Sequence, residues 1–341
     1  MSLKIRSVSV ATLLVVSLLI AVAPVGAQSG SHGSPECSFP VSETDATGRN
    51  VTVEERPERI VVLQASAAQT VWELDATDRV VGAPVVSYTE YLDGIEDKTN
   101  VLNADEFSVN REAVVELEAD LVLAPNVVPD DTVASLREAE QTVFKFGFGT
   151  SLGFVAEKTE LTGRLIGSCS EAAETNAAYY DRIEAVENGT DDYEAPRVLH
   201  YSDGFTAGAN TFIDEIITTA GGTNVAAENG VEGYGELNEE ALVEWDPEVI
   251  VIADDGPGIP DSEAFDSTFA VRNDQVVALD GNYLSQPGPR IVIALEELAA
   301  ALEAAETAEP TEDQTDDTPG FGIGVASIAL LSAALLARRF G

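Results

Sequence analysis

The chain has few basic residues and almost no lysine. It holds 18 Lys and Arg against 60 Asp and Glu, which gives a formal charge of −42 at pH 7. This balance argues against nucleic-acid binding, because a surface of this charge repels a phosphate backbone. The acids run the length of the chain and suit molar salt, which screens their mutual repulsion. We therefore expect a protein from a halophile.

Long apolar runs are confined to the two ends of the chain. Near the N-terminus, Lys4 and Arg6 precede an apolar run over residues 8–23, and Val25-Gly26-Ala27 follows with the small residues of a cleavage site. This order is typical of a secretory signal peptide. We therefore predict that residues 1–27 are removed and that the protein is exported.

The second apolar run lies within residues 319–341. It follows an acidic spacer of Thr, Glu, Asp and Pro over 306–318 and precedes Arg338-Arg339, in agreement with the positive-inside rule. The tripeptide Pro319-Gly320-Phe321 resembles the C-terminal sorting signal of haloarchaeal surface proteins, which implies cleavage and transfer to a lipid anchor. A plain transmembrane tail is the alternative. Both predict a protein anchored by its C-terminus at the extracellular face of the cell membrane.

Cysteine and histidine are scarce, with two residues of each. Because exported proteins meet an oxidising environment, we expect Cys37 and Cys169 to form a disulfide. The histidines are too few for a transition-metal site with three or four histidine ligands, so we expect no metal and no cofactor. His32 lies near the mature start. His200 closes an apolar strand, where a histidine with satisfied hydrogen bonds is the common case.

The body of the chain contains an internal repeat. Residues 109–124 (VNREAVVELEADLVLA) match residues 237–252 (LNEEALVEWDPEVIVI) without gaps. Each copy continues from Asn with helical apolar spacing, breaks at an acidic turn and ends in an apolar strand. Strands of this kind are buried on both faces in parallel sheets covered by helices. A second pair of similar segments precedes the two copies of the repeat. Arg59–Leu63 and Arg197–Tyr201 are each predicted to form a strand that leads into a helix.

Residues 151–186 have helical apolar spacing and contain no proline. At ~1.5 Å per residue, a single helix over this segment would be ~50 Å long, enough to run along two lobes. We therefore predict an α/β fold with two Rossmann-like lobes, over 39–150 and 195–305, joined by one long linker helix over 151–189. We expect a monomer.

One motif would fit an enzyme. Gly149-Thr150-Ser151-Leu152-Gly153 matches G-x-S-x-G between a predicted strand over 142–148 and a helix, the context of a nucleophile elbow. The only downstream histidine, His200, belongs to a strand of the second half, and no glycine-rich oxyanion segment precedes the serine. We therefore interpret Ser151 as a helix cap and expect no enzymatic activity, with a secreted serine hydrolase as the alternative.

Aromatic and small polar residues lie around the ends of the predicted strands. Ligands of open α/β sheets bind at the carboxyl ends of the strands, and two facing lobes bring those ends together. Aromatic walls with few charges suit a large, flat and partly apolar ligand. The residues expected to bind the ligand in this cleft are Ser66, Tyr88, Tyr91, Phe107, Asn126, Tyr201, Phe205, Tyr234, Asp254, Tyr283 and Arg290.

Five motifs spread over 39–305 support this interpretation. They are Asp45-Ala46-Thr47-Gly48-Arg49, the segment 110–123, Phe205-Thr206-Ala207-Gly208, Ala220-Gly221-Gly222-Thr223-Asn224 and Pro287-Gly288-Pro289-Arg290. As a set they resemble the class III substrate-binding proteins of ABC importers, the ferric-siderophore and cobalamin type. The resemblance implies two lobes joined by a rigid helix, little hinge motion, and delivery of a metal chelate to an ABC permease and its ATPase.

Details within the family favour a corrinoid over a ferric siderophore. Phe205-Thr206-Ala207-Gly208, together with Tyr234 and Tyr283 at their spacings before Glu240 and Arg290, resembles cobalamin-binding proteins. The chain departs from the pattern where tyrosines stand in place of expected tryptophan.

A haem-binding protein of the same fold, with Tyr201 or His200 as axial ligand, is a further alternative. The resemblance also implies that Glu112 and Glu240, which occupy the same place in the two repeats, meet arginines of the permease.

Overall fold

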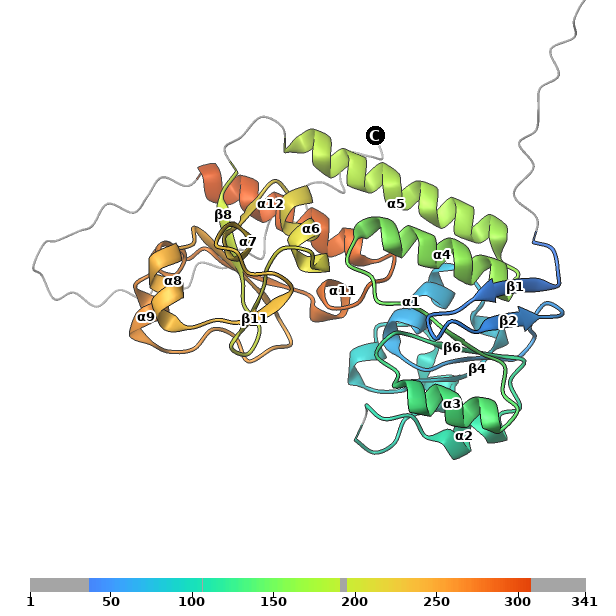
Figure 1. Cartoon of the computed structure of the whole chain (residues 1–341). Coiled ribbons are helices and arrows are strands. Elements are labelled where there is room, and N and C mark those ends of the chain that lie inside the picture. The colour runs from blue at the N-terminus through green and yellow to red at the C-terminus, as the bar shows by residue number, and fades with distance from the viewer. Residues whose placement is uncertain (1–36, 106, 191–194, 308–341) are drawn as a thin grey trace, which may run out of the picture.

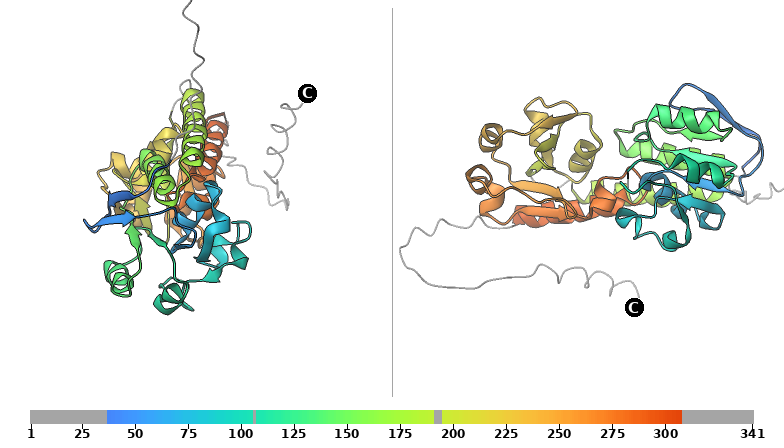
Figure 2. Two further views of the ribbon diagram at one scale, coloured as in Figure 1. Left: turned by 90° about the vertical axis from the view of Figure 1, so that its right-hand side faces the viewer. Right: turned by 90° about the horizontal axis from the view of Figure 1, so that it is seen from below.

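The computed structural model describes residues 37–105, 107–190 and 195–307. The predicted signal peptide, most of the acidic spacer and the C-terminal apolar segment lie outside these residues. Two lobes lie side by side, each built on a parallel sheet with helices on its faces (Figure 1 and the right view of Figure 2). Within the described residues, no helix is both long and apolar enough to cross a membrane.

The first lobe contains a five-stranded parallel sheet with the strand order β5-β4-β3-β6-β7. An antiparallel hairpin, formed by β1 and β2, lies beside it. The strands of this lobe are β1 (Val41–Thr44), β2 (Asn50–Val53), β3 (Ile60–Val62), β4 (Val80–Ala83), β5 (Thr99–Asn100), β6 (Leu121–Ala124) and β7 (Val143–Lys145). Its α-helices are α1 (Ala65–Glu73), α2 (Arg111–Glu116) and α3 (Asp130–Glu138), and its 3-10 helices are Thr77–Arg79, Ser87–Thr89 and Ile95–Asp97.

Apolar side chains of the first sheet alternate between two cores, one on each face. In β6, Leu121 and Leu123 join the core that also contains Ile60, whereas Val122 and Ala124 join the core on the other face. All four residues of β6 are fully buried. The continuous apolar run therefore marks a strand covered on both faces, as the sequence predicts.

The second lobe contains a four-stranded parallel sheet with the strand order β10-β8-β12-β13. A separate antiparallel ribbon pairs β9 with β11. The strands are β8 (Arg197–His200), β9 (Phe205–Ala207), β10 (Thr223–Asn224), β11 (Tyr234–Glu236), β12 (Val249–Ala253) and β13 (Val276–Leu279). The helices are α6 (Phe212–Thr219), α7 (Val225–Glu228), α8 (Glu239–Trp245), α9 (Glu263–Asp266), α10 (Phe269–Arg272), α11 (Gly281–Leu284) and α12 (Ile291–Thr307).

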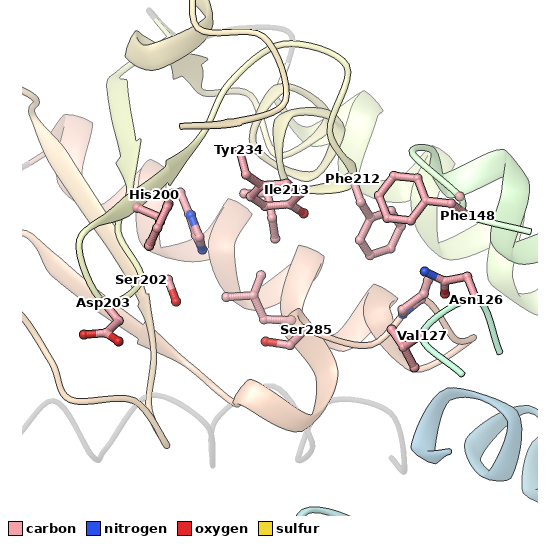
Figure 3. A pocket seen from close by; sticks show the side chains of 14 residues that line it. Asn126, Val127, Phe148, His200, Ser202, Asp203, Phe212, Ile213, Tyr234 and Ser285 are labelled. Carbon is pink, nitrogen blue, oxygen red and sulfur yellow. The ribbon is translucent and has the colours of Figure 1, made fainter. Parts of the chain in front are cut away.

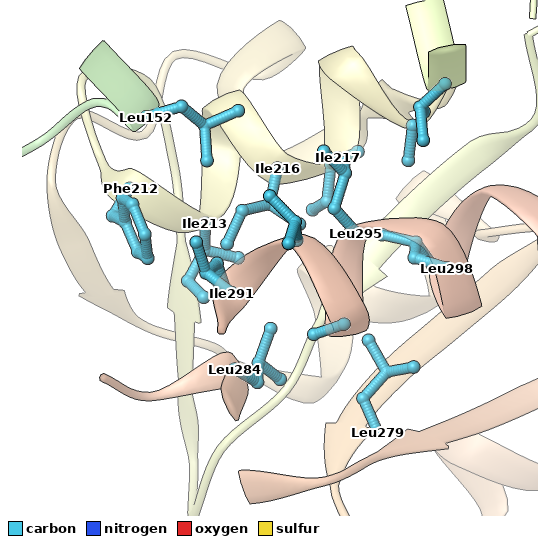
Figure 4. Close-up of a cluster of buried hydrophobic side chains, with 14 of the residues drawn as sticks. Leu152, Phe212, Ile213, Ile216, Ile217, Leu279, Leu284, Ile291, Leu295 and Leu298 are labelled. Carbon is cyan, nitrogen blue, oxygen red and sulfur yellow. The ribbon is translucent and has the colours of Figure 1, made fainter. Parts of the chain in front are cut away.

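The largest core of the second lobe packs α6 and α12 against its sheet and also includes side chains of α4 (Leu152–Ile166) and α5 (Cys169–Gly189). Figure 4 shows Ile213, Ile216 and Ile217 of α6 packed toward Leu295 and Leu298 of α12. All five side chains are buried. This core holds α6, and with it one wall of the interlobe space, against the sheet.

The internal repeat is confirmed as a structural repeat. Each copy forms a short helix followed by a buried strand, α2 with β6 and α8 with β12. The Asn110 side chain accepts the Ala113 N–H at 3.1 Å, and the Asn238 side chain accepts the Ala241 N–H at 2.8 Å. The shared asparagine is therefore a helix N-cap in both lobes.

The strand that precedes each repeat was predicted to lead into a helix, and it does so in the first lobe only. There β3 leads into α1, but β8 leads into a tight turn and the strand β9 before any helix. Asp203 and Gly204 both have positive φ, 46° and 86°, and Ser202 and Phe205 exchange backbone hydrogen bonds at 2.9 Å. An Asp-Gly pair favours a hairpin turn because glycine adopts positive φ without strain. The prediction of a helix directly after β8 is therefore wrong.

The prediction of one linker helix over 151–189 is also wrong. The segment forms two helices, α4 (Leu152–Ile166) and α5 (Cys169–Gly189), which pack against each other. Gly167 ends α4 in the left-handed conformation at φ 74°, which reverses the chain. The Tyr179 hydroxyl donates to the Leu152 carbonyl at 3.1 Å, so the two helices run antiparallel. The apolar spacing continued across the turn and concealed it.

Helix α5 nevertheless contacts both lobes, as expected of a linker. Ala172 joins a core of the first lobe, whereas Tyr179, Ile183 and Val186 join the main core of the second. Its 21 residues give a length of ~30 Å at ~1.5 Å per residue. Figure 1 shows α5 running across the top of the two lobes.

The predicted disulfide is present. Cys37 and Cys169 are bonded, with their Cα atoms 5.4 Å apart. Because Cys169 is the first residue of α5, the bond fixes the start of the described chain to the linker.

Candidate ligand-binding cleft

A cavity of about 460 Å³ lies between the two lobes (Figure 3). The first lobe contributes Asn126 and Val127, which follow β6, and Phe148 and Gly149, which follow β7. The second lobe contributes the larger part of the lining, namely His200, Ser202, Asp203, Phe205, Phe212, Ile213, Tyr234, Leu284, Ser285 and Pro287. The carboxyl ends of β6, β7 and β8 therefore meet at the cavity, in agreement with the rule for ligands of open α/β sheets.

Exposed aromatic side chains form much of the cavity wall. Phe148 is 66% exposed, Phe205 47% and Tyr234 55%. Phe205 and Tyr234 come from the paired strands β9 and β11, in which Tyr234 lies opposite Ala207 and Phe205 opposite Glu236. Because side chains two residues apart share a face of a strand, Phe205 and Tyr234 lie on the same face of the ribbon. The ribbon of β9 and β11 thus presents an aromatic surface to the cavity.

Polar side chains gather at one end of the cavity. Figure 3 shows His200, Ser202 and Asp203 together at one end, away from Asn126 and Val127. His200 is 7% exposed, and its Nδ1 atom has no hydrogen-bond partner among the described residues. Burial lowers the pKa of His200 to about 4, so the imidazole is neutral at pH 7. The expectation that His200 has its hydrogen bonds satisfied is therefore wrong at Nδ1.

Of the eleven residues predicted to bind the ligand, three line this cavity: Asn126, Phe205 and Tyr234. Sequence reasoning did not include the other two large exposed residues of the lining, Val127 and Phe148. Both follow strands of the first sheet, so the strand-end rule applied to β6 and β7 would have found them.

Tyr88 and Phe107 form a second aromatic pair on the first lobe, outside the cavity lining. Their rings are stacked with centroids 6.4 Å apart, and Phe107 is 76% exposed. The Phe107 carbonyl accepts a hydrogen bond at 3.0 Å from the side chain of Gln64, two residues after β3. The pair is therefore held at the carboxyl edge of the first sheet, where the sequence places it.

Four further predicted residues lie at the junction of the lobes instead of the cavity wall. Tyr91 of the first lobe and Tyr283 of the second meet edge to face at 5.7 Å. Arg290 forms an ion pair with Glu73 at 2.7 Å, and its guanidinium lies 5.4 Å from the Tyr91 ring centroid. Burial raises the pKa of Tyr91 to about 12. The fourth, Ser66, contributes its carbonyl to the contact described next.

Lys158 completes this junction from α4. Its ammonium donates to the Ser66 carbonyl at 3.0 Å and to the Pro287 carbonyl at 2.8 Å. One carbonyl belongs to the first lobe and the other to the second, so the lysine ties the lobes together. Burial lowers the pKa of Lys158 to about 7, because the charged form loses its water.

The last two predicted residues, Tyr201 and Asp254, lie away from the cavity lining. Tyr201 is buried and packs against Phe265, with ring centroids 5.0 Å apart. Asp254 accepts the Gly281 N–H at 3.0 Å, which fixes the start of α11. In this structure Tyr201 therefore belongs to a core and Asp254 to a helix start.

Ser151 has the capping role predicted for it. Its hydroxyl accepts the Phe154 N–H at 3.0 Å at the start of α4.

Glu112 and Glu240 are exposed in the first turns of α2 and α8. In the described part of the chain, no group of three or more His, Cys, Asp and Glu side chains is arranged to hold a metal ion.

Known proteins resemble the chain in both sequence and fold. The cobalamin-binding protein of Halobacterium salinarum is 40% identical over 365 residues, which cover 96% of this chain and 98% of that protein. The apo haem-binding protein RhuT from Roseiflexus sp. RS-1 superimposes with a TM-score of 0.66 at 26% identity, over 73% of this chain and 99% of its own. The vitamin B12-binding protein BtuF of Vibrio cholerae has a TM-score of 0.63 at 21% identity, over 74% and 99%.

Two segments match known families. Residues 318–339 match the PGF-CTERM motif, which confirms the motif predicted around Pro319-Gly320-Phe321. Residues 60–283, which include strands of both sheets and all of α4 and α5, match the periplasmic binding protein family. With its two lobes and an interlobe cavity, the chain belongs to the periplasmic binding protein family.

Proposed function

We propose that the protein is the extracellular substrate-binding protein of an ABC importer and that it binds a corrinoid of the cobalamin type between its lobes. The observation that carries this proposal is the interlobe cavity walled by Phe148, Phe205 and Tyr234. The full-length similarity to a cobalamin-binding protein supports the choice of ligand.

The wall residues supply binding energy through the apolar area that they lose to the ligand. Burial of apolar surface is worth ~25 cal/mol per Å², and a well-placed aromatic contact adds ~0.5–1.5 kcal/mol. A flat corrin ring can use several such faces at once. The amide groups at its edge find polar partners in Asn126, Ser202 and Ser285, which line the same cavity. The ligand is released unchanged.

The cavity is held open by the junction beside it. Lys158, together with the ion pair between Arg290 and Glu73, links the lobes by direct contacts. The Gln69 side chain adds to these, because its Oε1 accepts the Arg290 N–H at 3.0 Å. A preorganised binding site loses less conformational entropy when the ligand binds. Binding therefore proceeds with little hinge motion.

Delivery to the permease uses one acid on each lobe. Glu112 and Glu240 occupy equivalent first-turn positions on α2 and α8, and both are exposed. A carboxylate accepts both branches of an arginine side chain, so a permease made of two like subunits can offer one matching arginine to each lobe. The external salt screens exposed pairs, so these contacts form in a partly desolvated interface.

The C-terminal segment anchors the body at the outer face of the membrane. Its match to the PGF-CTERM motif supports cleavage and transfer to a lipid anchor over a retained transmembrane tail. Mass spectrometry of the native protein distinguishes them, because an intact Gly341 end means a tail and loss of the segment means processing.

Haem is the second candidate ligand, because haem-binding proteins share the fold and His200 lines the cavity. A competition experiment tests the assignment: the purified exported protein, in molar KCl, is titrated with cyanocobalamin, haemin and a ferric hydroxamate, each monitored by absorbance. We expect 1:1 binding of the corrinoid, with the other two unable to displace it at equal concentration. Tight binding of haemin or the hydroxamate without a corrinoid response would transfer the assignment to that ligand.

A further inference from the structure

His200 is placed by β8 at the polar end of the cavity. It is the last residue of a strand that lies inside the second sheet, between β10 and β12. Side chains of successive strand residues point to opposite faces. Leu199 and Tyr201 accordingly join one core, and His200, between them, faces the cavity (Figure 3). Of the two candidate axial ligands next to each other in the sequence, only His200 can reach a ligand in this structure.

The His200 imidazole is buried without its full set of partners. It is 7% exposed, and its Nδ1 atom has no hydrogen-bond partner among the described residues. Because Nδ1 is enclosed by the protein, a ligand in the cavity can reach the ring only through its other nitrogen, Nε2. Burial also lowers the pKa of His200 to about 4, so the ring is neutral at pH 7 and carries one free lone pair.

A lone imidazole with no accompanying ligands does not hold a bare metal ion. The described residues contain no cluster of three or more side chains able to do so. A metal that reaches His200 must therefore arrive already held by other donors, as in a planar chelate with an open axial position. The aromatic surface of Phe205 and Tyr234, which line the same cavity, suits the flat face of such a chelate.

Resting on the proposed function, we propose that the His200 imidazole coordinates the cobalt of the bound corrinoid in an axial position. The cleft then binds more tightly those corrinoids whose axial position is open or occupied by exchangeable water, and other corrinoids less tightly. In this step one cobalt–nitrogen bond forms with the imidazole lone pair and one cobalt–water bond breaks. No electron is transferred, and the water leaves intact.

Two corrinoids with the same ring test the proposal: diaquocobinamide, whose axial waters exchange, and dicyanocobinamide, whose axial positions are blocked. We expect the exported protein in molar KCl to shift the visible absorption bands of the first only, and to bind it at least about tenfold more tightly. His200→Gln should abolish the shift and remove that preference, so that the two cobinamides bind the variant with affinities within about twofold of each other. His32→Gln, which removes the chain's other histidine, is the matched control and should behave as the wild type.

A second measurement does not depend on the folding of a variant. The wild-type protein, loaded with cob(II)inamide, should show a three-line nitrogen splitting in its electron paramagnetic resonance spectrum, which becomes two-line when the protein carries ¹⁵N-histidine. Corrinoid binding without this splitting, or a band shift that survives His200→Gln, would overturn the coordination. Failure of both cobinamides and cobalamin to bind the wild type would instead overturn the proposed function.

Discussion

Replacing Lys158 by Met should remove a pH dependence from the free energy of unfolding. Lys158 is fully enclosed between the lobes, and its ammonium donates only to the carbonyls of Ser66 and Pro287 among the described residues. Phe146 lies beneath it, with the ammonium 5.9 Å from the ring centroid. No carboxylate pairs with this charge in the described part of the chain. Loss of hydration is therefore the main reason why the pKa of Lys158 is lowered.

The sign follows from proton counts in the two states. The unfolded chain holds the Lys158 proton up to the ordinary pKa of 10.5, whereas the folded protein releases it at about 7. Between these values the unfolded state binds more protons, so the free energy of unfolding rises with pH. Linkage with these two pKa values gives a rise of roughly 2 kcal/mol from pH ~7 to ~9. The two carbonyls favour the ammonium, so this figure is an upper value.

Chemical denaturation in molar KCl at the two pH values measures this rise. The wild type should gain up to about 2 kcal/mol between them, and Lys158→Met should lack this gain whatever its stability at neutral pH. Lys98→Met is the matched control, because Lys98 is less buried and donates to the Thr77 carbonyl on the first lobe only. It should keep the wild-type rise. An equal rise in the wild type and in Lys158→Met would refute the argument.

Three further predictions concern the disulfide, salt and docking. Replacing Cys37 and Cys169 by Ser should lower the free energy of unfolding by up to ~5 kcal/mol, because the bond closes a loop over 132 positions; a loss under ~1 kcal/mol by chemical denaturation would contradict the chain-entropy reasoning. With a formal charge of −42, the thermal unfolding midpoint should rise from dilute to molar KCl; a midpoint independent of salt would count against the halophile interpretation. Glu112→Ala combined with Glu240→Ala should abolish cellular corrinoid uptake with ligand affinity kept within about twofold, and normal uptake would leave both acids as helix caps only.

The parts of the fold that were predicted correctly depend on local pattern. The apolar runs of β6 and β12 specify buried parallel strands, and the helical apolar spacing after the shared Asn specifies α2 and α8 in the two copies of the repeat. The helical hairpin was missed because the apolar spacing of α4 continues in phase into α5, so the turn at Gly167 left no break in the pattern. The strand after β8 could have been predicted, since Asp203-Gly204 is a strong hairpin signal.

The candidate site was predicted only in part because side-chain roles there depend on contacts between lobes. From the sequence, Arg290 and Tyr283 are predicted to line the cleft. In the structure they contact Glu73 and Tyr91, which lie about 200 positions earlier in the chain. No local pattern reports such a pairing. Phe205 was found as the first residue of the Phe205-Thr206-Ala207-Gly208 motif and Tyr234 by its spacing before Glu240, and β9 and β11 then bring them to one face.

The central claim is that the aromatic cleft between the lobes binds cobalamin, and a single titration series tests it most directly. Cyanocobalamin is titrated calorimetrically into the wild type, Tyr234→Ala and Tyr180→Ala. Tyr180 is 50% exposed on α5, similar to Tyr234 at 55%, but lies outside the cavity lining. We predict 1:1 binding that Tyr234→Ala weakens about 2- to 13-fold, from the loss of ~0.5–1.5 kcal/mol of aromatic contact, and that Tyr180→Ala leaves unchanged. Absence of cobalamin binding by the wild type, or equal weakening by both substitutions, would contradict the account.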